Sequence, residues 1–343
     1  MDGKSSAAAM CLMLCIYPCF GQNPTPTSAP VAAAPASPSP IDEIKKSVVF
    51  LQADCPKLDQ KGEPEHDLHG DIVPDSHSGT AFLLGLSDPR LPSGQIFAYL
   101  VTNRHVAQPG IEDGKPCSPI AYYLRGDTRN PDKVGSYSVI TKFPADFGWV
   151  FPSDPSVDLA IAPIRVDVDT LDVAIISASL LLTSEDVSKN KIEEGDPVLF
   201  AGLFVQFVGG SHSEPIVRSG KIAMMPREAV STTLRHPGDI YLVDCHVFGG
   251  NSGSPMFVDL GGFRRGVVSS VYDYKLLGVV SGYVQESASF ELQAVASYAG
   301  TVAANSGVAI AVPAQKVLDL LNDPRLVSER DNSVAISKKG STH

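Results

Sequence analysis

Short runs of aliphatic, β-branched and aromatic residues follow one another from residue 43 onward, separated by turn-forming residues. Runs of this length and composition predict β-strands. In the first half they cover 47–51, 80–84, 97–101, 121–124, 136–140 and 159–164. In the second half they cover 198–202, 216–217, 240–243, 256–258, 278–280 and 307–310. Residues 56–78 are mostly polar and predict a long loop.

These two sets of strands indicate an all-β protein. Many short strands in two blocks favour either two barrels or a sandwich. An α/β doubly wound fold needs helices between its strands, and the sequence offers none there. The clearest helix covers 313–321, where Pro313 precedes a segment with an apolar face.

Both ends of the chain differ from this middle part. Residues 1–21 combine Lys4 with an apolar run and are typical of a signal peptide; a retained membrane anchor and a lipidated Cys19 are the alternatives. The Pro- and Ala-rich residues 22–42 predict an extended linker, and the polar residues 323–343 a flexible tail. The folded domain is therefore expected over 43–322, with a division near 165–195. The protein is expected to be secreted or periplasmic, without stable membrane insertion after signal cleavage.

Composition and charge narrow the classes of partner. The 343 residues carry a formal net charge of −11 and no cluster of Lys and Arg, which argues against nucleic-acid binding. After signal removal Cys55, Cys117 and Cys245 remain. Cys55 and Cys117 either form a disulfide or stay free, and the odd Cys245 is expected to be a buried apolar residue rather than a catalytic thiol.

The strongest candidate for chemistry is the segment Gly249-Gly250-Asn251-Ser252-Gly253-Ser254-Pro255. A serine needs a neighbouring base before it becomes a nucleophile. Glycines on both sides allow a tight turn and bring backbone N–H groups close to a reacting carbon. The N–H groups of Gly250 and Ser252 are thus candidates for an oxyanion hole. A Gly/Ser turn without catalytic meaning is the alternative.

Two further residues supply the partners of such a serine. His105 follows the predicted strand at 97–101 in the sequence Thr102-Asn103-Arg104-His105, and Asp158 begins the next apolar run. A carboxylate buried beside a histidine fixes its tautomer and stabilises the imidazolium that forms during attack. The chain order His, Asp, Ser excludes the α/β-hydrolase and subtilisin arrangements.

Together these motifs resemble the trypsin-like (chymotrypsin-fold) serine peptidases, over roughly residues 45–322. The Gly-Asn-Ser-Gly-Ser-Pro segment resembles the bacterial branch that contains glutamyl endopeptidases and HtrA-type proteases. The resemblance implies two successive six-stranded antiparallel β-barrels with a C-terminal helix. It also implies His105, Asp158 and Ser252 as the catalytic triad and a polypeptide as the substrate, with no cofactor.

The same resemblance implies a substrate-binding segment. Ser281, Gly282 and Tyr283 would pair with the substrate backbone, and His246 would lie near the floor of the specificity pocket. A histidine there favours an acidic side chain, but Val280 departs from the glutamyl endopeptidase pattern, which leaves specificity open. Asn251 stands where animal trypsins use an aspartate to bind a newly cut N-terminus, which places that route of activation in doubt.

The expected function is a secreted serine endopeptidase that acts through an acyl-enzyme on Ser252. A non-catalytic binding module on the same fold and an esterase with the same triad are the alternatives. The His- and Asp-rich loop at 65–77 matches no strong metal-binding spacing, so no metal site is predicted there.

Overall fold

The computed structural model describes residues 39–340, apart from 135, 265–266, 270–272 and 294–296. The predicted signal peptide and nearly all of the predicted linker therefore lie outside the described residues. Helix α1 (Pro40–Ser47) begins inside the last part of that predicted linker. The Ser39 side chain caps it by accepting a hydrogen bond from the amide of Ile41.

The first half of the chain forms one sheet. It consists of β1 (Val48–Pro56), β2 (Pro74–Ser87), β3 (Ile96–Thr102), β4 (Ala121–Asp127), β5 (Ser138–Pro144), β6 (Ala160–Pro163) and β7 (Ile176–Ser177). The strand order is β5-β4-β1-β2-β3-β6, all antiparallel, with the short β7 parallel to β2. Among the described residues no ladder joins β5 to β6, so this sheet closes less completely than the predicted barrel. Apolar side chains of β5 and of the segment after β6, including Phe143 and Ile164, pack into one cluster across that gap.

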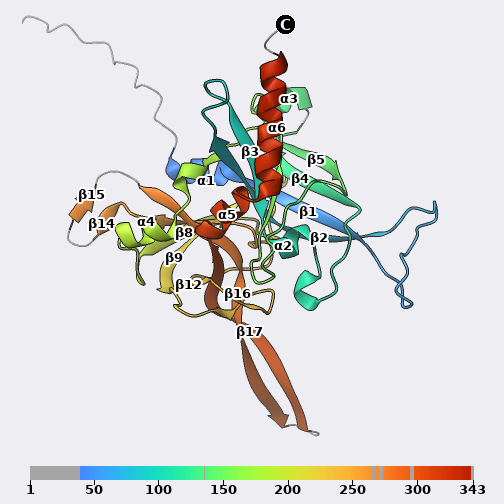
Figure 1. The fold of residues 1–343 in the computed structure, drawn as a ribbon. Coiled ribbons are helices and arrows are strands. Elements are labelled where there is room, and N and C mark those ends of the chain that lie inside the picture. Colours follow the sequence, from blue (N-terminus) through green and yellow to red (C-terminus); the bar gives the residue numbers. More distant parts are fainter. Residues whose placement is uncertain (1–38, 135, 265–266, 270–272, 294–296, 341–343) are drawn as a thin grey trace, which may run out of the picture. The chain divides into compact units, whose positions relative to one another are not determined.

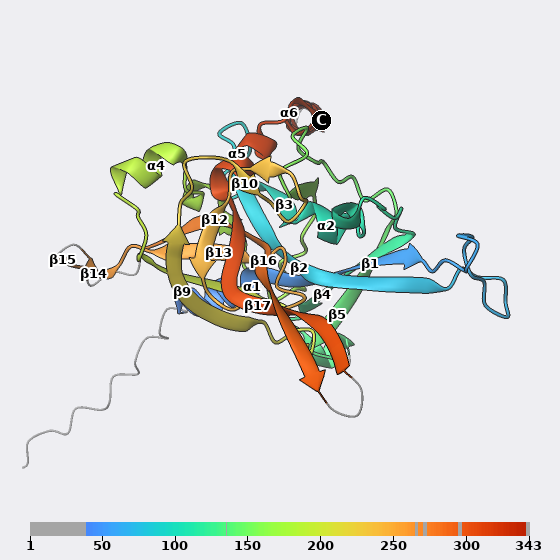
Figure 2. The ribbon, with the colours of Figure 1, turned by 90° about the horizontal axis from the view of Figure 1, so that it is seen from below.

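The second half forms a closed antiparallel barrel (Figure 2). Its strands are β8 (Pro197–Gly202), β9 (Ile216–Met224), β12 (Tyr241–Asp244), β13 (Pro255–Asp259), β16 (Tyr274–Gln293) and β17 (Ser297–Pro313). Their order around the barrel is β12-β17-β16-β13-β8-β9. The expectation of an all-β protein with two successive antiparallel units of the chymotrypsin type is confirmed. β16 and β17 are much longer than the runs at 278–280 and 307–310, and their outer parts extend away from the barrel as a hairpin (Figure 1).

Two helices follow the barrel. Helix α5 (Ala314–Leu321) confirms the helix predicted at 313–321 and buries Val317, Leu320 and Leu321. The tail expected to be loose is instead helical over α6 (Pro324–Gly340), because Leu326, Arg330 and Val334 share one buried face of that helix.

The remaining elements are short. They are α2 (Arg104–Ala107), α3 (Pro131–Val134), α4 (Ser184–Lys189), the 3₁₀ turns at Ile111–Asp113 and Ala178–Leu180, and the two-stranded pairs β10 (Val230–Ser231) with β11 (Pro237–Gly238) and β14 (Gly262–Arg264) with β15 (Val267–Ser269). Of these, α2 matters most for the site, because it carries His105.

One apolar core is shared by both halves of the domain. It contains Phe82 and Leu84 from β2 together with Phe200 and Met256 from the barrel, all of them fully buried. Burial of this kind contributes roughly 1.5–3 kcal/mol for each large apolar side chain. A disulfide between Cys55 and Cys117 ties the end of β1 to the segment before β4. The shared core holds the end of β3 and the turn before β13 in fixed positions.

Candidate active site

The turn that carries Ser252 is held by its own side chains and backbone. The buried Asn251 accepts a hydrogen bond from the amide of Phe248 (2.8 Å) and donates to the carbonyl oxygen of Leu203 (2.6 Å). The amide of Ser254 donates to the carbonyl oxygen of Asn251 (3.0 Å), which closes the turn around Ser252. Asn251 therefore stabilises the conformation of this turn.

Two glycines make this turn possible. Gly250 and Gly253 have φ angles of +92° and +89°, in the left-handed region that favours glycine. A Cβ on Gly253 would collide with the carbonyl oxygen of Thr80 and the hydroxyl of Thr102. The glycines that the sequence singled out are thus required by both conformation and space.

Two threonines from the first sheet support the same turn, and no local sequence pattern predicts this role. The Thr80 hydroxyl donates to the carbonyl oxygen of Gly250 (2.7 Å), and the Thr80 amide donates to the carbonyl oxygen of Ser252 (2.8 Å). The Thr102 hydroxyl donates to the carbonyl oxygen of Thr80 (2.6 Å). Residues of the first sheet therefore bond directly to the Ser252 turn, which precedes strand β13 of the barrel.

His105 and Asp158 meet as the sequence predicted. The end of β3 and helix α2 place His105 so that its Nδ1 lies 2.7 Å from Oδ2 of Asp158. The backbone amide of His105 donates to Oδ1 of the same carboxylate (3.1 Å), and the Asn103 side chain donates to the backbone carbonyl of Asp158 (2.8 Å). The Asp158 side chain is fully buried, and that of His105 is 15% exposed. This hydrogen bond places the proton on Nδ1 and leaves Nε2 free to accept another.

Burial and charge oppose each other in this pair. Burial lowers the pKa of His105, but the carboxylate of Asp158 outweighs burial, so the pKa lies above its ordinary value of 6.5. Burial likewise raises the pKa of Asp158, and the positive charge and hydrogen bond of His105 lower it by more, so the net direction is downward. The pair thus favours an ionised Asp158 and an imidazole that accepts a proton readily.

Ser281 connects the pair to Ser252. It lies at a bulge in β16, where the register against β17 shifts between Val280 and Gly282. Its hydroxyl donates to Oδ2 of Asp158 (2.6 Å), and its carbonyl oxygen accepts from the Ser252 hydroxyl (3.1 Å). Sequence reasoning assigned Ser281 to substrate binding only, and the hydrogen bond to Asp158 is an additional contact.

The structure therefore brings all three predicted triad residues to one place. Gly79 lies between Val106, the neighbour of His105, and the carbonyl oxygen of Ser252. In the part of the chain that the structure describes, the Ser252 hydroxyl bonds to the Ser281 carbonyl and not to His105. Catalytic hydrogen bonds are often loose without substrate and tighten only in the complex.

The two backbone amides predicted to form an oxyanion hole are both available. Among the described residues, the N–H groups of Gly250 and Ser252 donate to no acceptor. The intervening Asn251 amide is used internally, since it donates to the carbonyl oxygen of Phe248 (3.0 Å). Two unsatisfied amides on either side of a bonded one are suited to receive an oxygen from outside the chain.

The predicted substrate strand has one free edge. β13 pairs with β16 only as far as Val279, whereas Gly282 and Tyr283 pair with Ile310 and Ala309 of β17 on the other side. Val280 still exchanges hydrogen bonds with Gly253 and Ser254 on the first of these edges. Beyond Val280, no strand of the described residues pairs with that edge of Gly282 and Tyr283, which leaves it available to an added strand.

His246 lies beside the barrel strands rather than in the triad. Its exposed ring packs against Gly307 of β17, where a Cβ would come within 3.1 Å of it. Together with Arg218, Lys221 and Asp244 it lines a cavity of about 770 Å³. Positively charged side chains outnumber the single carboxylate in this lining.

Other sequence predictions concern residues away from the triad. Cys245 is buried and burial raises the pKa of its thiol, which suits an inert core residue.

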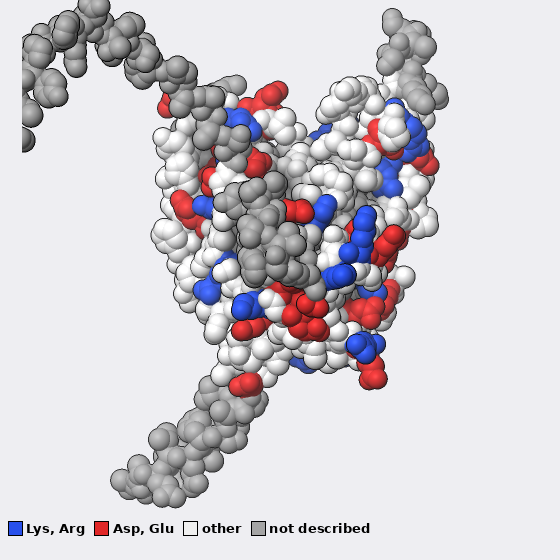
Figure 3. Space-filling model, turned by 90° about the vertical axis from the view of Figure 1, so that its left-hand side faces the viewer, with Lys and Arg blue, Asp and Glu red and all other residues white. Residues whose placement is uncertain are grey.

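Within the described ranges, no cluster of His, Cys, Asp and Glu is arranged to hold a metal ion. No described helix combines the length and apolarity needed to cross a membrane. On the face in Figure 3, acidic and basic side chains are interspersed.

Comparisons with known proteins add little to this geometry. No protein-family model matches the chain, and no curated protein matches it. Among solved structures, the HtrA-type protease AlgW with a decapeptide has a TM-score of 0.43 and 17% identity, over 82% of this chain and 65% of that one. Deg5 has a TM-score of 0.39 and 16% identity, over 70% and 81% of the two chains. The inactive form of the Rv3671c protease has a TM-score of 0.40 and 17% identity, over 83% and 96%.

At these TM-scores and identities we base the assignment of the fold on the chain's own architecture and not on the similarity to these structures. That architecture consists of a closed six-stranded antiparallel barrel, a preceding antiparallel sheet and C-terminal helices. His105 lies on α2 just after β3, Asp158 lies just before β6, and Ser252 lies in the turn before β13, in the chain order His, Asp, Ser. The chain has a chymotrypsin-like fold.

Proposed function

We propose that this protein is a serine endopeptidase with Ser252 as nucleophile, His105 as general base and acid, and Asp158 as the residue that orients His105. The observation that carries the proposal is the chain of contacts from His105 through Asp158 and Ser281 to Ser252. The available amides of Gly250 and Ser252 supply the remaining component, an oxyanion hole.

The proposed reaction begins when a peptide occupies the site. The Ser252 hydroxyl leaves the Ser281 carbonyl by rotation about its Cα–Cβ bond and donates to Nε2 of His105. His105 takes the proton as Ser252 attacks the peptide carbonyl, and Asp158 stabilises the imidazolium. The carbonyl oxygen, now negatively charged, is bound by the two amides. His105 then gives the proton to the leaving amine, and water hydrolyses the acyl-enzyme by the same steps.

The proposed substrate is an extended polypeptide. Its backbone adds a strand to the open edge at Gly282 and Tyr283, and a side chain next to the cleaved bond enters the cavity at His246. Because cationic side chains outnumber the carboxylate there, we expect little cleavage after Arg or Lys. Secretion, the signal peptide and a bacterial origin remain predictions from the sequence.

Turnover of a peptide library by residues 39–343 tests this function. Wild type is expected to cleave internal peptide bonds, and Ser252→Ala is expected to lose essentially all turnover while keeping the wild-type unfolding midpoint. His105→Ala is expected to lose turnover as well, with some loss of stability because Asp158 then lacks its buried partner. Cleavage at the wild-type rate by Ser252→Ala would overturn the assignment. Hydrolysis of esters without any cleavage of amides would favour an esterase instead.

A further inference from the structure

Residues 203–215 connect β8 to β9, and their first residues pack against the turn of Ser252. Leu203 accepts a hydrogen bond from Asn251 and donates its amide to the Thr80 hydroxyl (2.8 Å). Val205 and Leu203 crowd Gly250 so closely that a Cβ there would lie 2.6 Å from Val205. The conformation of this loop therefore bears directly on the amide of Gly250.

The C-terminal part of the same loop forms hydrogen bonds with one arginine of the first sheet. The Arg125 guanidinium, on β4, donates through Nη2 to the carbonyl oxygens of Gly209 (2.9 Å), Gly210 (3.1 Å) and His212 (3.0 Å). Its Nε donates to the Ser138 hydroxyl (2.7 Å) on β5, which fixes the direction of the side chain. A planar guanidinium suits this task because it presents several donors in a rigid arrangement.

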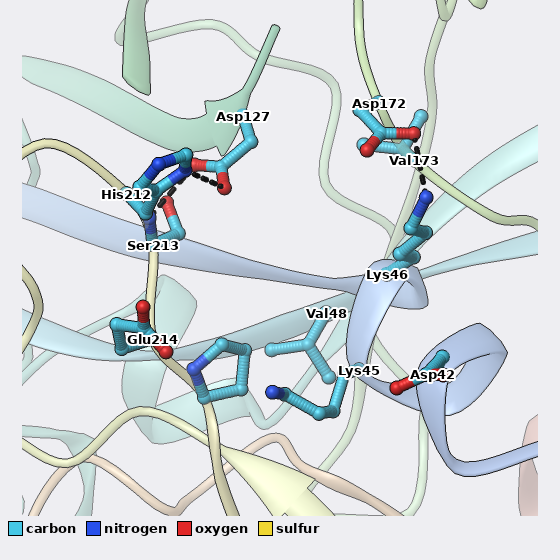
Figure 4. Close-up of a pocket in the computed structure, with 11 residues that line it drawn as sticks. Asp42, Lys45, Lys46, Val48, Asp127, Asp172, Val173, His212, Ser213 and Glu214 are labelled. Carbon is cyan, nitrogen blue, oxygen red and sulfur yellow. Dashed lines mark hydrogen bonds and ion pairs between the residues drawn. The ribbon is translucent and has the colours of Figure 1, made fainter. Parts of the chain in front are cut away.

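Asp127, two residues further along β4, forms a second set of contacts with this part of the loop. Its carboxylate accepts from the amide of Ser213 (2.7 Å) and lies 3.3 Å from Nδ1 of His212. Figure 4 shows these groups facing one another at a cavity of about 450 Å³. The His212 ring also packs on Tyr137, with ring centroids 4.2 Å apart.

The middle of the loop contains glycines and exposed side chains. Gly209 has a φ of +82° and is followed by Gly210, so the backbone there is intrinsically free. Val205 and Phe207 are largely exposed and contribute little burial. The polar contacts of the loop are concentrated at its two ends, at Asn251 and at Arg125 with Asp127, while Phe204 lies beside Phe248 and Val208 packs against the core.

We propose that Arg125 is a positioning residue for the proposed peptidase site, acting through the loop 203–215 on the amide of Gly250. The inference rests on the proposed function. Arg125 touches neither substrate nor the reacting atoms. It holds the loop in the one path that keeps Leu203 and Val205 against the oxyanion turn.

The test compares Arg125→Met with Arg129→Met. Arg129 also donates to two backbone carbonyls, those of Val168 and Leu171, but both lie in the first half of the chain and outside the loop. Each variant is assayed on a peptide that wild type cleaves, well below its own unfolding midpoint. Arg125→Met is expected to lower kcat by about 10-fold to 100-fold with KM within about two-fold, since a misplaced oxyanion donor affects the transition state. Arg129→Met is expected to keep wild-type kcat.

A second variant covers the case in which Arg125→Met fails to fold. Arg125→Lys keeps the charge and most of the volume but offers fewer, differently placed donors, and is expected to lower kcat by about 3-fold to 10-fold. Methylguanidinium added to Arg125→Ala, which leaves room for it, is expected to restore part of kcat, which a loss of stability alone would not allow. Equal kcat values for the Arg125 and Arg129 variants overturn the inference, as does an effect on KM alone. Absence of turnover in wild type would instead overturn the proposed function.

Discussion

Gly253 is the residue beside Ser252 that has least freedom to change. Its left-handed backbone and its contact with the Thr80 carbonyl oxygen both exclude a side chain. Gly249, in the same turn, has no atom within 4 Å of where a Cβ would stand and no positive φ. The two positions can therefore be compared directly, because a side chain is excluded at Gly253 and has room at Gly249.

Gly253→Ala is expected to destabilise the protein by about 2–4 kcal/mol, because the backbone strain and the collision with Thr80 add together. Gly249→Ala is expected to change stability by about 0.5 kcal/mol or less. Urea unfolding of both variants measures this difference. Equal stabilities would show that the turn around Ser252 is not packed as described.

The raised pKa of His105 sets the pH dependence of activity. The histidine must be neutral to accept the proton of Ser252, so kcat/KM is expected to rise with pH through a pKa above 6.5. In Asp158→Asn the carboxylate charge is lost, so the acidic limb moves to lower pH while kcat falls by about 10⁴-fold. A pH–rate profile for both proteins checks this. An acidic limb that stays in place, or moves upward, contradicts the assignment of Asp158.

Helix α6 is attached to the rest of the domain partly through one buried polar side chain. Arg330 is only 7% exposed, and its Nη1 donates to the hydroxyl of Tyr99 and to the carbonyl oxygen of Leu321, each at 2.9 Å. It lies between the buried Leu326 and Val334 on the same face. A buried arginine with two acceptors holds α6 against β3 and the end of α5.

Arg330→Met is expected to cost about 1.5–3 kcal/mol of unfolding free energy, because Tyr99 and Leu321 lose a charged donor. Arg325, at the start of the same helix, bonds to Asp323 at the surface. Arg325→Met is therefore expected to cost about 1 kcal/mol or less. Chemical unfolding of the two variants decides between these values, and a larger cost for Arg325→Met would contradict the account of α6.

Across the whole molecule, the disulfide is the longest-range covalent constraint that the structure describes. Cys55 and Cys117 are 62 residues apart in sequence. Replacing both by Ala is expected to destabilise the protein by about 2–5 kcal/mol. A reductant should lower the stability of wild type and leave the double variant unchanged. An effect of the reductant on the double variant would point to Cys245 instead.

The apolar pattern predicted most of the strands and helix α5, because short buried runs and an apolar helical face are visible in a single sequence. It missed α6, because Arg330 interrupts that helix's apolar face. It also missed the length of β16 and β17, because the apolar runs at 278–280 and 307–310 cover only the parts of these strands that lie in the barrel, while the outer residues pair with each other. The motifs predicted that His105 and Asp158 lie together, which the structure shows, whereas their role with Ser252 as a catalytic triad stays a prediction. Contacts such as Ser281 with Asp158, or Arg125 with the loop 203–215, join segments far apart in sequence and leave no local signal.

The most direct test of the proposed active site is the chemistry of Ser252 itself. A fluorophosphonate probe is added to wild type, Ser252→Ala and Ser254→Ala, and the adduct is mapped by mass spectrometry of peptide fragments. The account predicts a single adduct on Ser252 in wild type and Ser254→Ala, formed faster as His105 deprotonates, and none in Ser252→Ala. A folded wild-type protein that fails to react, or an adduct on another serine, would contradict it.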